Sequence, residues 1–427
     1  MSGSFVVTKS PEMVVQTSKP ATNGAAVADK KIELSPFDRS LVRTQTKVLL
    51  VFEHPINEPM ETIRRSLSRA LVDYYPLAGR LAVDGNDYYI DCSIHDGVTF
   101  ATASLPAGGL DGDATGARHD QSAAKAGGCN RANFPLLTVQ VTVFACGGFV
   151  VGVVWDHSVA DGFGMAQFLL AVGELARGLP TPSIVPLRNL SPMQLVMPPV
   201  TYAVMRFIGG MPSCDLGAGM VNVTAPSTFI NRIKSSGTTP AAAAFTVFEI
   251  VTAVVWKCRT RGVMADPAAP AVLLFSVNVR KQLGVDDAYY GNCMTLEMAM
   301  ADSGEVASAD ILDVAWMIRR AKEQISDQDS SGELLKAIGE LGERRVGYES
   351  VVFVTCWREI GFEDVDFGGG KTGRVMTFSQ NFAMPLCVIC LPCKWDKGSK
   401  VLSGCVTAQH SDAFLREIST LTNNLTD

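Results

Sequence analysis

The chain has 427 residues, of which 47% are hydrophobic and 19% charged, a balance typical of globular rather than disordered proteins. Its formal net charge is -6 at pH 7 and no basic cluster rises above that background, so we expect neither nucleic acid nor an anionic membrane surface as a partner. No apolar stretch approaches the roughly 18 unbroken residues of a membrane span, and no charged-then-apolar leader follows Met1. We therefore expect a cytoplasmic protein.

Helix-like and strand-like patterns mix in both halves of the chain, which predicts a mixed α/β (α+β) fold of two domains, each with its own core. Periodicity predicts, in chain order, a helix at 60–71, strands at 137–143 and 149–155, a helix at 162–175, a helix at 245–255, a strand at 271–279 and a helix at 311–325. Residues 106–131 lack periodicity and predict a surface loop. The proline-rich residues 180–199 predict a crossover between domains.

A histidine stands where a strand passes into a helix. Residues 137–143 alternate apolar and polar side chains, a Cys-Gly-Gly turn at 146–148 follows, and residues 149–155 return as an apolar strand. His157 follows at its end, and the helical period begins after Asp161 and Gly162. Because an imidazole can accept and return a proton near neutral pH, His157 is a candidate general base.

The chain has eleven cysteines, and an odd number scattered through apolar segments predicts free, mostly buried thiols. Cys387, Cys390 and Cys393 have spacings that suit a metal. Their setting is strand-like, however, and a strand directs positions three apart to opposite faces. We therefore expect no metal site.

The residues argue against two other enzyme classes, P-loop nucleotide hydrolases and serine hydrolases. Gly370-Lys371-Thr372 matches the end of a phosphate-binding P-loop, but the glycine required five positions earlier is Val365. A serine hydrolase of the nucleophile-elbow type would carry Gly-x-Ser-x-Gly, which the chain lacks.

The segment His157-x-x-x-Asp161-Gly162 resembles the signature of the BAHD family, the CoA-dependent acyltransferases of plant specialised metabolism. Residues 366–370, Asp-Phe-Gly-Gly-Gly, are similar to the family's Asp-Phe-Gly-Trp-Gly element. Five more segments resemble family motifs in the family's order: 34–38 (an opening strand motif), 75–80 (the turn after the first helix), 278–280, 290–292 (a loop) and 355–357. The resemblance spans nearly the whole chain.

The resemblance implies two similar chloramphenicol-acetyltransferase-like lobes with a solvent channel between them. We place the N-terminal lobe at residues 1–180, the crossover linker at 181–222 and the C-terminal lobe at 223–427. It implies a monomeric enzyme that moves an acyl group from acyl-CoA, a co-substrate rather than a bound cofactor, to a hydroxyl or amine of a small metabolite. A family-like protein that binds a small molecule without turnover is the alternative.

The resemblance also implies roles for single residues. His157 would be the base, and Asp161 would be structural, with its carboxylate turned away to pair with Arg280. Thr355 and Trp357 would lie beside the reacting carbonyl; the alternative is that Trp357 serves only in packing.

Asp366 would anchor its loop by the same resemblance. Gly369 departs from the family pattern, because it replaces an indole by hydrogen. We therefore expect this loop to be looser than in relatives, without loss of the base.

Overall fold

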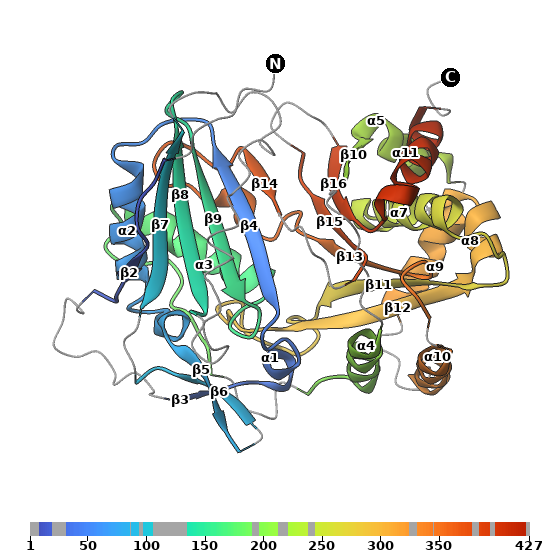
Figure 1. The fold of residues 1–427 in the computed structure, drawn as a ribbon, viewed down its shortest axis with the longest axis horizontal. Helices are drawn as coiled ribbons and strands as arrows, with labels where there is room; N and C mark the ends of the chain where they lie inside the picture. Colours follow the sequence, from blue (N-terminus) through green and yellow to red (C-terminus); the bar gives the residue numbers. More distant parts are fainter. Residues whose placement is uncertain are drawn as a thin grey trace. The chain divides into compact units, whose positions relative to one another are not determined.

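The computed structural model describes residues 8–18, 31–85, 87–93, 97–105, 135–189, 196–211, 221–237, 244–323, 331–344, 346–377, 384–392 and 398–423. The chain divides into two compact units, each built from three separate stretches of sequence (Figure 1). The first unit comprises Met1–Val196, Arg280–Cys293 and Glu359–Met376. The second comprises Met197–Val279, Met294–Arg358 and Thr377–Asp427.

The first unit contains two sheets in its described residues. The larger has the strand order β1-β7-β8-β9-β4-β14, with β2 also pairing with β7, and the smaller has the order β3-β6-β5. The strands are β1 (Thr8–Lys9), β2 (Met13–Val15), β3 (Lys31–Glu33), β4 (Gln45–Phe52), β5 (Arg80–Asp84), β6 (Asp87–Asp91), β7 (Val98–Leu105), β8 (Leu137–Phe144), β9 (Phe149–Asp156) and β14 (Arg374–Met376). The helices are α1 (Pro36–Ser40), α2 (Pro59–Ala70), η1 (Tyr75–Ala78), α3 (Gly162–Ala176) and η7 (Phe362–Asp364).

The predicted strands and helix around His157 are confirmed as β8, β9 and α3. β8 and β9 pair antiparallel with Leu137 opposite Trp155, and the turn between them uses Gly147 at a φ of 86°. That value lies in the left-handed region, which glycine adopts without strain. The helices α2 and α3 pack against each other beside this sheet, and their inward side chains, such as Leu67 and Phe168, are buried (Figure 1).

The second unit contains one six-stranded sheet in its described residues, with the order β10-β16-β15-β13-β11-β12. Its strands are β10 (Val221–Pro226), β11 (Pro270–Asn278), β12 (Met294–Asp302), β13 (Val351–Cys356), β15 (Leu386–Cys390) and β16 (Gly398–Gly404). Its helices are α4 (Pro199–Gly210), α5 (Ser227–Ser236), α7 (Val247–Val263), α8 (Ser303–Ser308), α9 (Ile311–Glu323), α10 (Ser331–Glu343) and α11 (Ala408–Asn423). The helices predicted at 245–255 and 311–325 and the strand at 271–279 are confirmed as α7, α9 and β11, with Ile325 outside the described residues.

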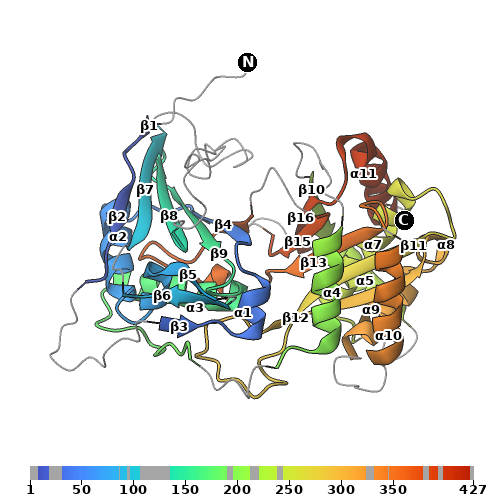
Figure 2. The same ribbon diagram turned by 60° about the horizontal axis from the view of Figure 1, so that its bottom comes forward.

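Helices cover both faces of the second sheet (Figure 2). Leu273 and Phe275 of β11 pack into a core shared with α5, α7, α9 and α11, whereas Val272 and Leu274 pack into another shared with α4 and α10. A strand buried on both faces needs apolar side chains at successive positions, which explains why β11 lacks polar alternation. The mixed α/β fold class predicted from the sequence is confirmed.

The segment at 34–38 was expected to be a strand, and this expectation is wrong. Strand β3 ends at Glu33, and the helix α1 begins at Pro36. Ser35 and Asp38 form a capping box, in which each side chain accepts a hydrogen bond from the backbone N–H of the other. Such a box, with proline in the first turn, favours the start of a helix.

The surface loop expected at 106–131 lies outside the described residues, as does part of the crossover expected at 181–222. In the parts of the chain that the structure describes, no helix combines the length and apolar character that a membrane span requires.

We expect Glu297 to make the stability of the second unit depend on pH. This carboxyl lies on β12 opposite Phe275 and is 5% exposed, and burial raises its pKa from 4.5 to about 7. The folded state thus favours the protonated carboxyl. Its contribution to the free energy of unfolding is complete below about pH 4.5 and is lost as the pH rises through about 7. In Glu297→Gln we expect a melting temperature that depends less on pH across this window.

The control for this measurement is Glu340→Gln, at an exposed position of α10. It should keep the pH dependence of the unchanged protein. Equal pH dependence in Glu297→Gln and the unchanged protein would contradict the assignment.

Candidate active site

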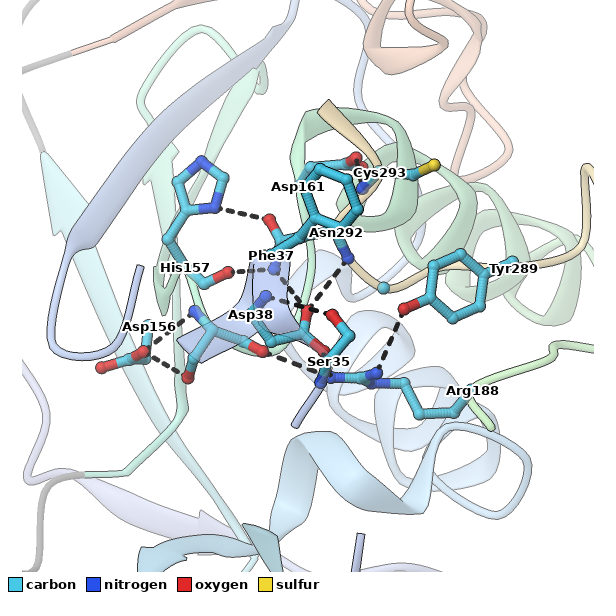
Figure 3. A network of polar contacts seen from close by, with 12 residues as sticks. Ser35, Phe37, Asp38, Asp156, His157, Asp161, Arg188, Tyr289, Asn292 and Cys293 are labelled. Carbon is cyan, nitrogen blue, oxygen red and sulfur yellow. Dashed lines mark hydrogen bonds and ion pairs between the residues drawn. The ribbon is translucent and has the colours of Figure 1, made fainter. Parts of the chain in front are cut away.

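His157 lies directly after β9 and is fixed by its backbone and by its ring. Its backbone N–H donates to the carbonyl oxygen of Thr44 at 2.7 Å, and Nδ1 lies 2.9 Å from Oδ1 of Asn292 (Figure 3). The preceding Asp156 accepts hydrogen bonds from the backbone N–H groups of Arg43 and Ser158. No described residue forms a hydrogen bond to Nε2 of His157.

Asp161 is the N-cap of α3 and is 2% exposed. Its Oδ1 accepts from the backbone N–H of Gly164 at 2.9 Å, and its Oδ2 from that of Cys293 at 3.0 Å. Arg280 donates to both oxygens, at 2.8 and 2.9 Å. Burial opposes the charge of the Arg280 guanidinium, but attraction to Asp161 outweighs it, so its pKa is raised.

The Asp161 carboxylate therefore bonds to Arg280 and to two backbone amides rather than to the imidazole. Arg280 in turn donates to the carbonyl oxygens of Gly291 and Tyr289, at 2.7 and 3.3 Å. Breaking a buried pair of this kind by removing one partner typically costs about 3–5 kcal/mol. The pair holds the segment Arg280–Cys293 against the turn that follows His157.

Three residues of this site were not named as site residues from the sequence. They are Asp38 in α1, Arg188 in the expected crossover and Asn292 in the expected mid-chain loop (Figure 3). Ser35-x-x-Asp38 has the spacing of a capping box, which is the one local signal that could have indicated Asp38. Nothing local indicates Arg188.

Asp366 organises the loop that resembles the family's second motif. Its Oδ1 accepts from the backbone N–H groups of Gly368 and Gly370, at 2.7 and 3.0 Å, and both glycines adopt left-handed φ angles of 115° and 109°. Arg177, the C-cap residue of α3, donates to the Asp366 carbonyl oxygen, and its Nη1 lies 4.0 Å from Oδ2. Phe367 packs edge-on against Phe52 of β4, with ring centroids 5.1 Å apart.

The position of the family's tryptophan is crowded. A Cβ atom added to Gly369 would lie 2.9 Å from Cγ2 of Ile56 and 3.1 Å from the carbonyl oxygen of His54. Residues 54–56 therefore occupy the space that a larger side chain at position 369 would need.

Thr355 and Trp357 belong to the second unit, at the end of β13 and just after it. Thr355 Oγ1 lies 2.9 Å from Oγ of Ser276, and the Trp357 backbone N–H donates to Ile389 at 2.7 Å. Trp357 is 8% exposed. Their action together with His157, in the first unit, stays a prediction.

The cysteines near the expected metal spacing lie on β15. Cys387 and Cys390 are buried, and burial raises the pKa of each thiol. Cys393 lies outside the described residues. Among the residues that are described, no group of three or more His, Cys, Asp or Glu side chains could hold a metal ion.

A family model described as the Transferase family matches residues 5–417. The chain belongs to this family, the BAHD acyltransferases. The BAHD assignment made from the motifs is therefore confirmed.

Relatives from rice and from Taxus cuspidata match most of the chain. It is 47% identical to Acyl transferase 15 from rice (Oryza sativa subsp. japonica), over 98% of this chain and 99% of that protein. It is 30% identical to 2-alpha-hydroxytaxane 2-O-benzoyltransferase from Taxus cuspidata, over 82% of this chain and 81% of that one.

Two solved structures are similar in fold. Vinorine synthase matches with a TM-score of 0.75 at 23% identity, over 97% of this chain and 98% of that one. F. graminearum TRI101 complexed with coenzyme A and T-2 mycotoxin matches with a TM-score of 0.66 at 16% identity, over 90% and 96%. This BAHD chain therefore shares their fold.

We expect Gly369→Trp to lower the free energy of unfolding by about 1–3 kcal/mol, because the indole would have to displace residues 54–56. A thermal melt measures the effect. The matched control is Gly339→Trp on α10, where nothing lies within 4 Å of the added Cβ, and it should not lower the melting temperature. A higher melting temperature for Gly369→Trp would contradict the crowding described here.

Proposed function

We propose that this protein transfers an acyl group from an acyl-CoA thioester to a hydroxyl group of a small plant metabolite, with His157 as the general base. Membership of the acyltransferase family supports the reaction class. The observation that carries the role of His157 is its placement: a rigid strand end, a ring bonded through Nδ1, and Nε2 without a partner among the described residues.

The proposed reaction is direct transfer in a ternary complex. The acceptor hydroxyl gives its proton to Nε2 of His157 while its oxygen attacks the thioester carbonyl. Collapse of the tetrahedral intermediate then releases CoA thiolate, which takes the proton from the imidazolium. Thr355 and Trp357 would stabilise the oxyanion through a hydroxyl and an indole N–H. Asp161, Arg280 and Asp366 hold loop geometry and take no part in proton transfer.

The names of relatives favour a hydroxyl acceptor over an amine. One is a 2-O-benzoyltransferase that acts on a 2-alpha-hydroxytaxane, and another, from Crocosmia x crocosmiiflora, is a 6'-O-caffeoyltransferase that acts on a myricetin glycoside. Both names specify O-acylation with an aromatic acyl group. We therefore include aromatic acyl-CoAs and hydroxyl-bearing acceptors in the substrate class.

A panel of acyl-CoAs and acceptors, with release of free CoA as the readout, tests the reaction. The alternative is a family-like protein that binds a small molecule without turnover, and it predicts binding without CoA release. We further propose a monomer in the cytoplasm that needs no cofactor, which size-exclusion chromatography, cell fractionation and assays in the presence of chelator can check.

The role of the base predicts a large kinetic effect. His157→Ala should lower kcat by about 10²–10⁴-fold, because proton transfer to a positioned side chain contributes that much. Thioester binding and the melting temperature should change little, since among the described residues the ring forms one side-chain hydrogen bond. Unchanged turnover in His157→Ala would contradict this mechanism.

Direct transfer predicts that the acyl group never resides on the protein. Cys293 is the cysteine adjacent to Asn292, and burial raises the pKa of its thiol to about 11, so the thiolate required for attack is scarce at neutral pH. Mass spectrometry after incubation with acyl-CoA alone should show no added acyl mass. A stoichiometric adduct that one Cys or Ser substitution abolishes would refute the ternary complex.

A further inference from the structure

Asp38 is fully buried, and its carboxylate accepts four hydrogen bonds, two at each oxygen (Figure 3). Oδ1 accepts from the backbone N–H and from Nδ2 of Asn292, at 3.1 and 2.8 Å. Oδ2 accepts from Nη2 of Arg188 at 2.9 Å and from the backbone N–H of Ser35 at 3.0 Å. All four partners are N–H donors, which a carboxylate with its two acceptor oxygens satisfies. An amide side chain at position 38 would place its own NH₂ group against N–H donors.

Arg188 supplies the balancing charge. Burial alone would lower the pKa of its guanidinium, but attraction to Asp38 outweighs burial and the pKa is raised. Arg188 Nη2 also donates to the carbonyl oxygen of Ser158, next to the base, at 3.2 Å. The pair therefore joins the expected crossover segment, α1 and the turn that carries His157.

The contacts of Asn292 permit only one orientation of its amide. Nδ2 lies 2.8 Å from Oδ1 of Asp38 and 2.7 Å from the carbonyl oxygen of His157, and neither oxygen can donate. If the amide were turned over, its oxygen would face two acceptors in a buried place, which is strongly unfavourable. The amide oxygen of Asn292 therefore faces Nδ1 of His157.

An amide oxygen only accepts hydrogen bonds, so Nδ1 of His157 carries the proton in this contact. In the neutral imidazole the lone pair is then on Nε2, as a general base acting through Nε2 requires. We propose, resting on the function proposed above, that Asn292 is a positioning residue that fixes this tautomer of His157, and that the Asp38–Arg188 pair fixes Asn292.

The first test measures the tautomer itself and needs no substrate. The chain has five histidines, and ¹⁵N-histidine NMR distinguishes the protonated from the unprotonated ring nitrogen of each, with His157→Gln assigning the signal. The neutral ring of His157 should carry its proton on Nδ1 in the unchanged protein. In Asn292→Ala it should shift towards Nε2. A neutral His157 with its proton on Nε2 in the unchanged protein would overturn the proposal.

The second test is kinetic and uses a matched pair of arginines. Glu249 of α7 is, like Asp38, a buried capping-box acid at the third helical position, and it pairs with Arg319 at 2.8 Å. Arg188→Met and Arg319→Met thus each break a buried pair at a helix start. We expect both to lower the melting temperature.

Only Arg188→Met should lower kcat, by about 10–100-fold, at a temperature where both variants are folded. The KM values should change little, and Arg188→Lys should recover part of the rate because it keeps the charge. If Arg188→Met stays folded with the kcat of Arg319→Met, the positioning role of the pair is refuted.

The outcomes separate this inference from the proposed function. If His157→Ala keeps full turnover, the proposed base fails, whereas the NMR result on the tautomer stands. If His157→Ala loses turnover but Asn292→Ala changes neither tautomer nor kcat, the base stands and the positioning role fails.

Discussion

The buried pair of Asp161 and Arg280 is the interaction on which the arrangement around His157 depends. It joins the helix that follows His157 to the segment Arg280–Cys293, which leaves the second unit after β11 and returns to it at β12. Gly164 makes the approach possible, because a Cβ there would lie only 1.8 Å from the carbonyl oxygen of Tyr290. Together with the hydrogen bonds from Asn292 to Asp38, this contact brings Asn292, 135 residues away in sequence, to the imidazole.

Three aspartates of the first unit, Asp38, Asp161 and Asp366, follow one structural scheme. Each accepts backbone N–H bonds that shape its loop, and each pairs with an arginine from another segment: Arg188, Arg280 and Arg177, respectively. They differ in burial. The first two pairs are at most 6% exposed, whereas the Arg177–Asp366 pair is 34% and 25% exposed and spans 4.0 Å. An exposed pair contributes little, so the Asp366 loop relies more on its backbone bonds and on Phe367.

Local sequence pattern was enough to predict the elements that carry His157, because residues 137–143 alternate, residues 149–155 form an apolar run and a helical period follows Asp161. The family resemblance failed at residues 34–38, where a strand motif was expected but the capping box of Ser35 and Asp38 starts a helix. Capping chemistry determines the local structure there. The partner of His157 could not be predicted this way, since Asn292 is 135 residues from His157, and Asp38, which bonds to Asn292, is 254 residues from it. The crowding at Gly369 was equally hidden, because it depends on residues 54–56 of another segment.

The interleaved sequence of the two units has a consequence for synthesis on the ribosome. The N-terminus of a nascent chain leaves the ribosome first, so β9, His157 and Asp161 emerge long before Arg280 has been translated. Until then the Asp161 carboxylate lacks the charge that lets it be buried. β14, an edge of the same sheet, is made later still, and the first unit becomes complete only when Met376 has left the exit tunnel. Unlike a domain of contiguous sequence, the first unit can complete its buried ion pair and its larger sheet only late in translation, and β4 lacks its partner β14 until then.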